Sequence, residues 1–151
     1  MKKIVTLFIL LALMLGAAPA SASTPLAVII DSVMNLDTST GTFVAYGPAV
    51  DAGLFCPTGT VTDLENMATG YQNGFRVNLH MTKILVCDDG SGEIYMMLNV
   101  RLIFGADETL SNWVLTDGTD AYPRLHGQGK IIATTAGNEV YDHYYGKLHD
   151  D

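Results

Sequence analysis

The segment CDDGSGEIYMML, residues 87–98, carries oxygen-bearing side chains at a spacing that could bind calcium. An EF-hand loop needs oxygen ligands at positions 1, 3, 5 and 12, glycine at 6 and an apolar residue at 8. The middle of the segment satisfies four of these positions with Asp89, Ser91, Gly92 and Ile94. However, Cys87 would stand at position 1 and Leu98 at position 12, where a bidentate glutamate is needed. The segment is therefore not predicted to be an EF-hand.

The same residues suit a tight turn between two strands. Asp88 and Asp89 favour turns through side-chain to backbone hydrogen bonds, and Gly90 and Gly92 accept positive φ. A hairpin is therefore predicted, in which the strand ending at Cys87 folds back onto the next. A weak surface calcium site formed by Asp88, Asp89 and Glu93 is the alternative. The favoured prediction is that the chain has no metal site.

Cys56 and Cys87 are the chain's two cysteines and predict a disulfide, the simplest state for an even pair in an exported protein. The bond would close a loop of about 30 residues and stabilise the fold by about 3 kcal/mol. A cysteine nucleophile is the alternative. It is disfavoured because no activating base stands nearby in the sequence and an oxidising compartment opposes a free thiol.

The four histidines have no spacing typical of a zinc site. His143 and His149 could gather a surface metal together with the neighbouring Asp142, Asp150 and Asp151, but solvated side chains near a terminus are favoured. His80 lies on the polar side of its strand and is predicted to be exposed. The chain contains no nucleophile elbow, phosphate loop or HExxH motif, so no catalytic residue and no cofactor are predicted.

The elements that must position these residues are strands. Residues 75–82 alternate between apolar and polar side chains, which indicates a half-buried strand. Residues 94–104 alternate over eleven positions, longer than the five or six usual in a strand and suited to one wrapping around a small barrel. Further strands are expected at 26–30, 42–46, 113–116, 129–134 and 140–148, with one helical turn at 63–69. The predicted fold is all-β, a single antiparallel barrel of about eight strands.

The chain begins with two lysines, an apolar run from Ile4 to Leu15 and an Ala20-Ser21-Ala22 site, as a secretory signal peptide does. The run is shorter than the roughly 20 apolar residues that span a membrane. We therefore expect residues 1–22 to be cleaved, 23–151 to form one domain, and the product to be secreted, either extracellular or periplasmic, and not membrane-bound.

Charge limits the partners. The chain has eight Lys+Arg and sixteen Asp+Glu, and cleavage would remove two of those lysines. Nucleic acids and anionic lipids require clustered cations, so neither is an expected partner.

Several motifs together resemble a known group. The Cys-Pro-Thr-Gly at 56–59 is followed by the turn at 87–92, then by WVLTDGTDAY at 113–122 and LHGQG at 125–129. This series is similar to that of small secreted bacterial proteins and to the segment that marks allene oxide cyclases and dirigent proteins. The resemblance covers about residues 40–148. It implies an eight-stranded barrel with an apolar cavity, often a trimer in the plant families, so a homo-oligomer is an open alternative to a monomer.

Glycines in these motifs have expected structural roles. Gly118 would permit a turn that a Cβ opposes, and Gly127 and Gly129 would allow coiling or a bulge where a barrel bends. Asp117 and Asp120 replace glycines of the family pattern, and aspartate tolerates the left-handed conformation that the turn needs. No pocket residue of the cyclases or dirigents maps onto this chain by a local motif.

Two functions follow. The favoured one is a non-catalytic secreted barrel that binds a small apolar ligand or serves as an extracellular or envelope module. The alternative is a cyclase-like or dirigent-like enzyme that orients a reactive apolar substrate. A filled interior would favour the first, and a roomy pocket with buried carboxylates or tyrosines the second. Ordinary core packing is the alternative for the aromatic residues among the candidate cavity residues, which are Met96, Leu98, Trp113, Tyr122, Tyr141 and Tyr144.

Overall fold

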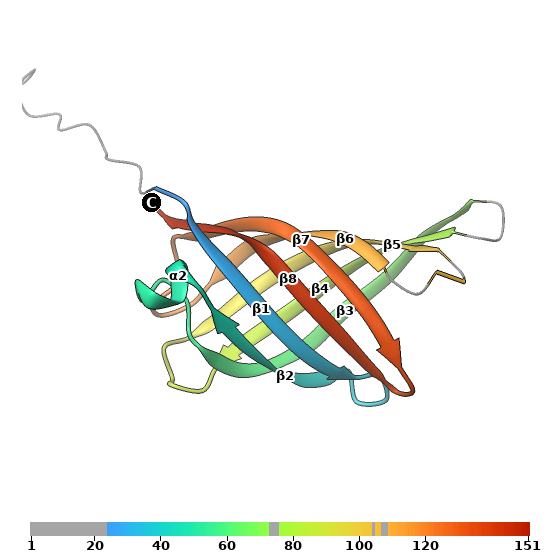
Figure 1. The fold of residues 1–151 in the computed structure, drawn as a ribbon, viewed down its shortest axis with the longest axis horizontal. Coiled ribbons are helices and arrows are strands. Elements are labelled where there is room, and N and C mark those ends of the chain that lie inside the picture. The colour runs from blue at the N-terminus through green and yellow to red at the C-terminus, as the bar shows by residue number, and fades with distance from the viewer. Residues whose placement is uncertain (1–23, 73–75, 104, 107–108) are drawn as a thin grey trace, which may run out of the picture.

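The computed structural model describes residues 24–72, 76–103, 105–106 and 109–151, and the predicted signal peptide lies outside them. These residues form a closed antiparallel barrel in which each strand pairs with the next and β8 pairs with β1 (Figure 1). The strands are β1 (Leu26–Asn35), β2 (Thr40–Tyr46), β3 (Thr58–Gln72), β4 (Arg76–Cys87), β5 (Glu93–Ile103), β6 (Thr109–Gly118), β7 (Leu125–Ala136) and β8 (Glu139–Asp150). The prediction of an all-β, eight-stranded barrel is confirmed.

Alternation along the strands decides which side chains enter the barrel. On β5, Ile94, Met96 and Leu98 are buried, whereas Met97 and Ile103 on the other side are exposed. Pairing of β8 with β1 leaves neither of these two strands with a free edge, because they satisfy each other's backbone hydrogen bonds. The interior face therefore becomes the core.

The helical turn expected at residues 63–69 is wrong, because this segment belongs to β3. The pairing of β3 with β4 shifts register between Asp63 and Glu65 and again between Thr69 and Tyr71. Each such irregularity puts an extra residue into one strand and interrupts the apolar–polar alternation by which a strand is detected. This interruption hid β3 in the sequence.

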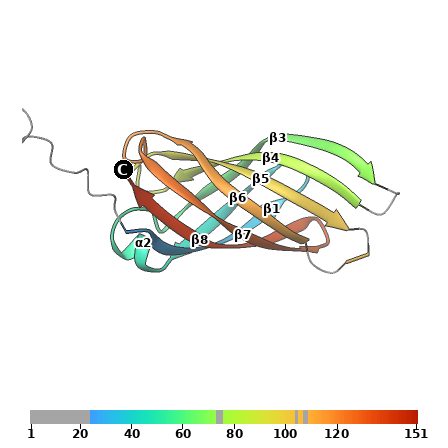
Figure 2. The same ribbon diagram turned by 90° about the horizontal axis from the view of Figure 1, so that it is seen from above.

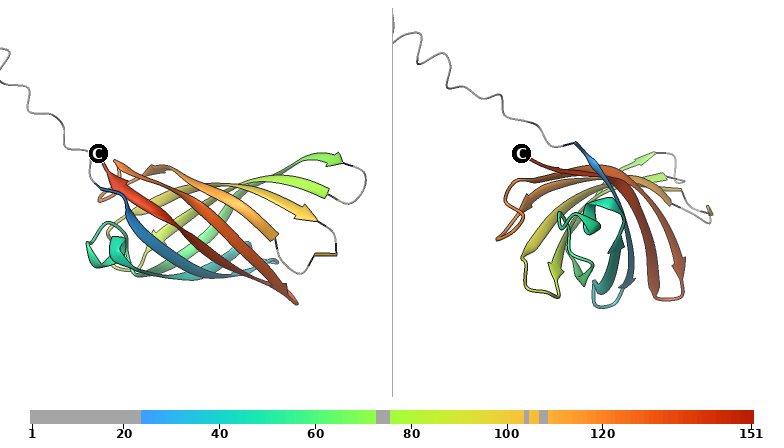
Figure 3. Two further views of the ribbon diagram at one scale, coloured as in Figure 1. Left: turned by 45° about the horizontal axis from the view of Figure 1, so that its top comes forward. Right: turned by 60° about the vertical axis from the view of Figure 1, so that its left-hand side comes forward.

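One end of the barrel is closed by a plug. The short helix α2 (Pro48–Asp51) lies within the ring of strands at this end (Figure 3, right panel). Ala49, Phe55 and Tyr122 are buried there, and the ring of Phe55 lies 6.0 Å from that of Phe43 and 6.4 Å from that of Tyr122. Aromatic pairs at these distances pack favourably, so this end is filled by side chains.

The β4–β5 connection is the predicted hairpin. Asp89 Oδ1 accepts hydrogen bonds from the Ser91 backbone N–H and the Ser91 hydroxyl. Gly90 and Gly92 have φ values of 75° and 137°, which a residue with a Cβ rarely adopts. The turn at residues 87–92 is therefore held by local hydrogen bonds and glycine.

The later glycines differ in part from expectation. Gly118 has no positive φ, but a Cβ there would lie 2.5 Å from the carbonyl oxygen of Tyr122, so the structure has the close turn expected at this glycine. The left-handed residue of that turn is Asp120, with φ 52°. Gly129 faces Gly146 across the β7–β8 pair, and a Cβ on either would meet the indole of Trp113. These two glycines provide the space in which Trp113 is buried, and no register shift interrupts their strands' pairing.

The opposite end of the barrel is uneven. β3, β4 and β5 extend beyond the other strands there, as two perpendicular views show (Figures 1 and 2). Within the described residues, no helix has the length and apolar character to cross a membrane.

Candidate functional site

The barrel contains a cavity of about 310 Å³ at the end opposite the plug, beside the β1–β2 turn. Its walls are mostly apolar and come from β1 and from β4 to β8: they include Met34, Leu79, Met81, Leu98, Val100, Leu102, Ile131, Ala133 and Val140. Its polar lining includes Asp63, Lys83, Ser111 and Asp142. An apolar cavity with a few converging polar groups is the usual form of a small-molecule site.

Lys83, Asp63 and Asp142 form a cluster of charged groups at the bottom of the cavity, called the floor below, and Lys83 lies at its centre. Its Nζ lies 3.1 Å from Asp142 Oδ2 and 3.2 Å from Asp63 Oδ1. The Lys83 and Asp142 side chains are 4 % and 5 % exposed, and that of Asp63 is 19 % exposed. Three ionisable groups from β3, β4 and β8 thus converge inside the barrel, although they are far apart in sequence.

Asp142 is held by hydrogen bonds from three directions. Its Oδ2 accepts from Lys83 Nζ at 3.1 Å, from the Tyr144 hydroxyl at 2.9 Å and from Ser32 Oγ at 3.4 Å. Burial, together with the nearby Asp142 carboxylate, raises the pKa of Tyr144 well above its ordinary value. Tyr144 is therefore a neutral hydrogen-bond donor that fixes the orientation of Asp142.

Two buried oxygens at the cavity are not used by this network. Asp63 Oδ1 is paired electrostatically with Lys83 but forms no hydrogen bond, and Ser111 Oγ has no hydrogen-bond partner among the described residues. Both residues line the cavity. A buried polar atom without a hydrogen-bond partner costs about 1–3 kcal/mol. A ligand that forms a hydrogen bond with either oxygen would therefore bind more tightly.

The charge of the floor is also unbalanced. With all three groups ionised, two carboxylates face one ammonium, which leaves one net negative charge. Buried ion pairs contribute little net stability, and apolar residues of similar volume often do as well or better. The three-charge cluster beneath the cavity is therefore weak evidence for stability by itself.

The residues predicted to line the cavity lie in three different places: the cavity wall, the packed core and the outer surface. Leu98 lines the cavity. Met96, Trp113, Tyr122 and Tyr144 are buried in the core but are not part of the cavity wall. Tyr141 is 42 % exposed, so its prediction as a lining residue is wrong. Asp142 and Tyr144 share the inward side of β8, and alternation places Tyr141 on the outer side.

Cys56 and Cys87 form the predicted disulfide, which joins the segment after α2 to the end of β4. Neither is available as a nucleophile, so the alternative role weighed for them is excluded. The Tyr122 hydroxyl lies 3.5 Å from Cys87 Sγ and 2.7 Å from Ser91 Oγ. Burial raises the pKa of Tyr122. The disulfide therefore belongs to the plug and not to the cavity.

The histidines lie away from the cavity. His80 is exposed, as predicted, and His126 and His149 stack with ring centroids 5.4 Å apart. His143 contacts Asp31 through its Nδ1 at 2.6 Å on the outer surface, whereas Asp142 points inward and cannot join it. Over the described ranges, no three His, Cys, Asp or Glu side chains are placed to hold a metal ion.

Sequence reasoning missed Lys83, Asp63 and Ser111. A signal for Lys83 was present, because it continues the inward series of Leu79 and Met81 and precedes Leu85 on the same side of β4. A lysine in an apolar series indicates either that the inward side of the strand has been assigned wrongly or that the lysine is buried beside an oppositely charged partner. Asp63 gave no comparable signal, since the bulge beside it disrupts the alternation of β3.

Comparisons of the chain with protein-family models, with curated proteins and with solved structures found no match.

Proposed function

We propose that this protein is an exported barrel that binds a small, mostly apolar molecule in its lumen, without transforming it. The ligand carries one hydrogen-bond donor or cationic group, which approaches the negatively charged floor. The observation that supports this proposal is the cavity itself: apolar walls surround a buried cluster in which Asp63 Oδ1 and Ser111 Oγ accept no hydrogen bond.

The volume and the lining of the cavity limit which ligands can bind in it. A volume of about 310 Å³ is at the lower end of the range for small-molecule pockets, so a compact molecule is expected. The apolar walls favour a hydrocarbon or aromatic body. A ligand with a carboxylate head is disfavoured because it would approach Asp63 and Asp142. Export is supported by the disulfide, a bond typical of oxidising compartments.

The proposal can be tested with N-phenyl-1-naphthylamine, an apolar fluorophore that carries one N–H donor and brightens when it leaves water. We expect saturable binding. Ala133→Phe should abolish it, because Ala133 lines the cavity and a phenyl ring would fill the space beside Asp142. Asp63→Asn and Ser111→Ala should weaken binding about two- to tenfold, the effect of one hydrogen bond.

Thr134→Phe is the matched control, since Thr134 neighbours Ala133 but lies exposed on the outer face. Equal binding of the probe by the Ala133→Phe and Thr134→Phe variants would contradict a site in the lumen. Native mass spectrometry of protein from its natural source can then identify the ligand. An unliganded mass from that source, with no probe binding, would also refute the proposal.

A second candidate is a cyclase-like or dirigent-like enzyme, in keeping with the resemblance of the glycine-rich turn. The buried carboxylates favour it, because Asp63 borders the cavity and its carboxylate, which also pairs with Lys83, could accept a proton from a bound substrate. The ligand identified by mass spectrometry decides between the two. Recovery of an altered molecule from wild type but not from Asp63→Asn would establish catalysis, and recovery of the unaltered molecule from both would establish binding alone.

A further inference from the structure

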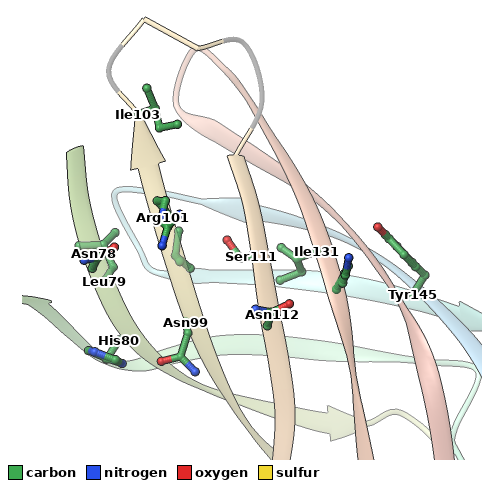
Figure 4. A pocket seen from close by; sticks show the side chains of 12 residues that line it. Asn78, Leu79, His80, Asn99, Arg101, Ile103, Ser111, Asn112, Ile131 and Tyr145 are labelled. Carbon is green, nitrogen blue, oxygen red and sulfur yellow. The ribbon is translucent and has the colours of Figure 1, made fainter. Parts of the chain in front are cut away.

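The outer face of the barrel has a second hollow, of about 720 Å³, across five strands from β4 to β8 (Figure 4). Strand pairing places one polar side chain from each strand in a single row: His80, Asn99, Asn112, Lys130 and Tyr145. Each member is the direct register partner of the next. Neighbouring strands are about 4.8 Å apart, so the row presents an evenly spaced series of hydrogen-bonding groups.

A second, shorter row lies beside the first. Asn78 on β4 is the register partner of Arg101 on β5, and both line the same hollow. Two cations and three amides therefore gather on one surface. Among the residues that the structure describes, no aspartate or glutamate lines this hollow, although the chain has sixteen acidic residues and a net charge of −8. The local charge is thus opposite in sign to that of the whole protein, which favours an anionic ligand.

These polar side chains are not engaged with the rest of the barrel. Among the described residues, Arg101 and Lys130 form no ion pair, unlike Lys83 and Arg124. The amides of Asn78, Asn99 and Asn112 likewise make no hydrogen bond within the described part of the chain. All five are exposed, so their donors and acceptors face solvent and can bind a ligand without breaking an internal contact.

From this arrangement we propose that the hollow on the outer face, called the groove below, is a separate binding site for a carboxylated carbohydrate chain. Amide side chains offer both a donor and an acceptor, which suits neighbouring sugar hydroxyls. Arg101 and Lys130 pair with the sugar carboxylates. The half-exposed ring of Tyr145 provides a flat surface for a sugar ring at the end of the row. An extended chain laid across the strands meets one of these groups at each strand.

Other polymers fit this surface less well. A nucleic acid needs many phosphate contacts, and this groove has two permanent cations. A peptide that adds a strand needs a free sheet edge, and none borders this groove, because each strand from β4 to β8 is paired on both sides. The two hollows share four bordering residues, Leu79, Val100, Ser111 and Ile131. The groove is therefore tested at Arg101, Lys130 and Asn112, which border it and not the lumen cavity.

The test is titration of ¹⁵N-labelled protein with oligogalacturonate, oligoalginate and hyaluronan fragments, followed by amide shifts in NMR spectra. At least one of these should shift amides of β4 to β8 around the two rows. Arg101→Gln and Lys130→Gln should each weaken binding about three- to tenfold, and Asn112→Ala less. Methyl-esterified oligogalacturonate, which keeps the sugar rings and loses the charge, should bind more weakly than the acid.

Lys147→Gln is the control, because Lys147 is an exposed cation of β8 outside the groove. Its affinity should match that of wild type. The proposal would be overturned if none of the three acids shifts the groove amides at millimolar concentration, or if Lys147→Gln and Arg101→Gln lose affinity equally. Equal binding of the acid and its ester would refute the anionic class. Melting curves of each variant show whether the fold is retained.

Discussion

Lys83 separates two carboxylates inside the lumen, so its removal would leave Asp63 and Asp142 without their cation. We expect Lys83→Met to lower the free energy of unfolding by about 3 kcal/mol, the usual cost of breaking a buried ion pair from one side. Urea denaturation measures the change. Lys147→Met, at an exposed position, should change stability by less than about 0.5 kcal/mol. Similar losses in the two variants would contradict a buried ionic floor.

Tyr144 makes stability depend on pH in the alkaline range. Its pKa is raised in the folded state, so the folded protein retains the phenolic proton where the unfolded chain releases it. This contribution is fully present below the ordinary tyrosine pKa of about 10 and is lost as pH rises toward the folded pKa. Wild type should therefore lose stability above about pH 10 more steeply than Tyr144→Phe. Parallel curves of unfolding free energy against pH for the two proteins would refute this role.

The same residues mark the limit of prediction from sequence. Met96, Leu98 and Trp113 were recognisable as interior residues because alternation alone decides the face of a strand. The ionic floor was not recognisable, because Lys83, Asp63 and Asp142 meet only when three strands adopt their register. Tyr141 and Tyr144 were grouped as neighbours in sequence, although an odd spacing within one strand puts them on opposite faces.

At the scale of elements, the plug depends on the disulfide. Cys56 and Cys87 are 31 positions apart, and their bond ties the segment after α2 to the end of β4. We expect Cys56→Ser/Cys87→Ser to lower the free energy of unfolding by about 3 kcal/mol, since the unfolded chain regains the entropy of the closed loop. Urea denaturation measures this loss, and wild type reduced with dithiothreitol should match the variant. An unchanged unfolding midpoint in the reduced protein would show that the plug is held by packing alone.

Strand boundaries were predicted unevenly for a physical reason. The sequence predicted β5 and the first half of β4 because both alternate strictly between apolar and polar residues. It did not predict β3, because two register shifts interrupt the alternation there. α2 was missed because four residues between Gly47 and Ala52 carry no periodic signal. The polar row on the outer face joins five strands, and no single strand reveals it.

At the scale of the whole molecule, closure separates an inside from an outside with different chemistry. The inside combines an apolar cavity with two carboxylates and one lysine, and the groove on the outside gathers two cations although the chain has a net charge of −8. Closure itself was predictable from the length of β5, which is greater than that of an ordinary strand. The distribution of charge was not, because net charge gives no information about position.

The β1–β8 pairing that closes the barrel also brings the start of β1 beside the end of β8, with Leu26 opposite Leu148. Both ends lie at the plugged end, away from the cavity opening (Figure 1). A short peptide could therefore join them, and new termini could be cut at the β7–β8 turn, giving a circular permutant with the same barrel. A label or surface tether attached beside the start of β1 or the end of β8 would leave the opening directed outward.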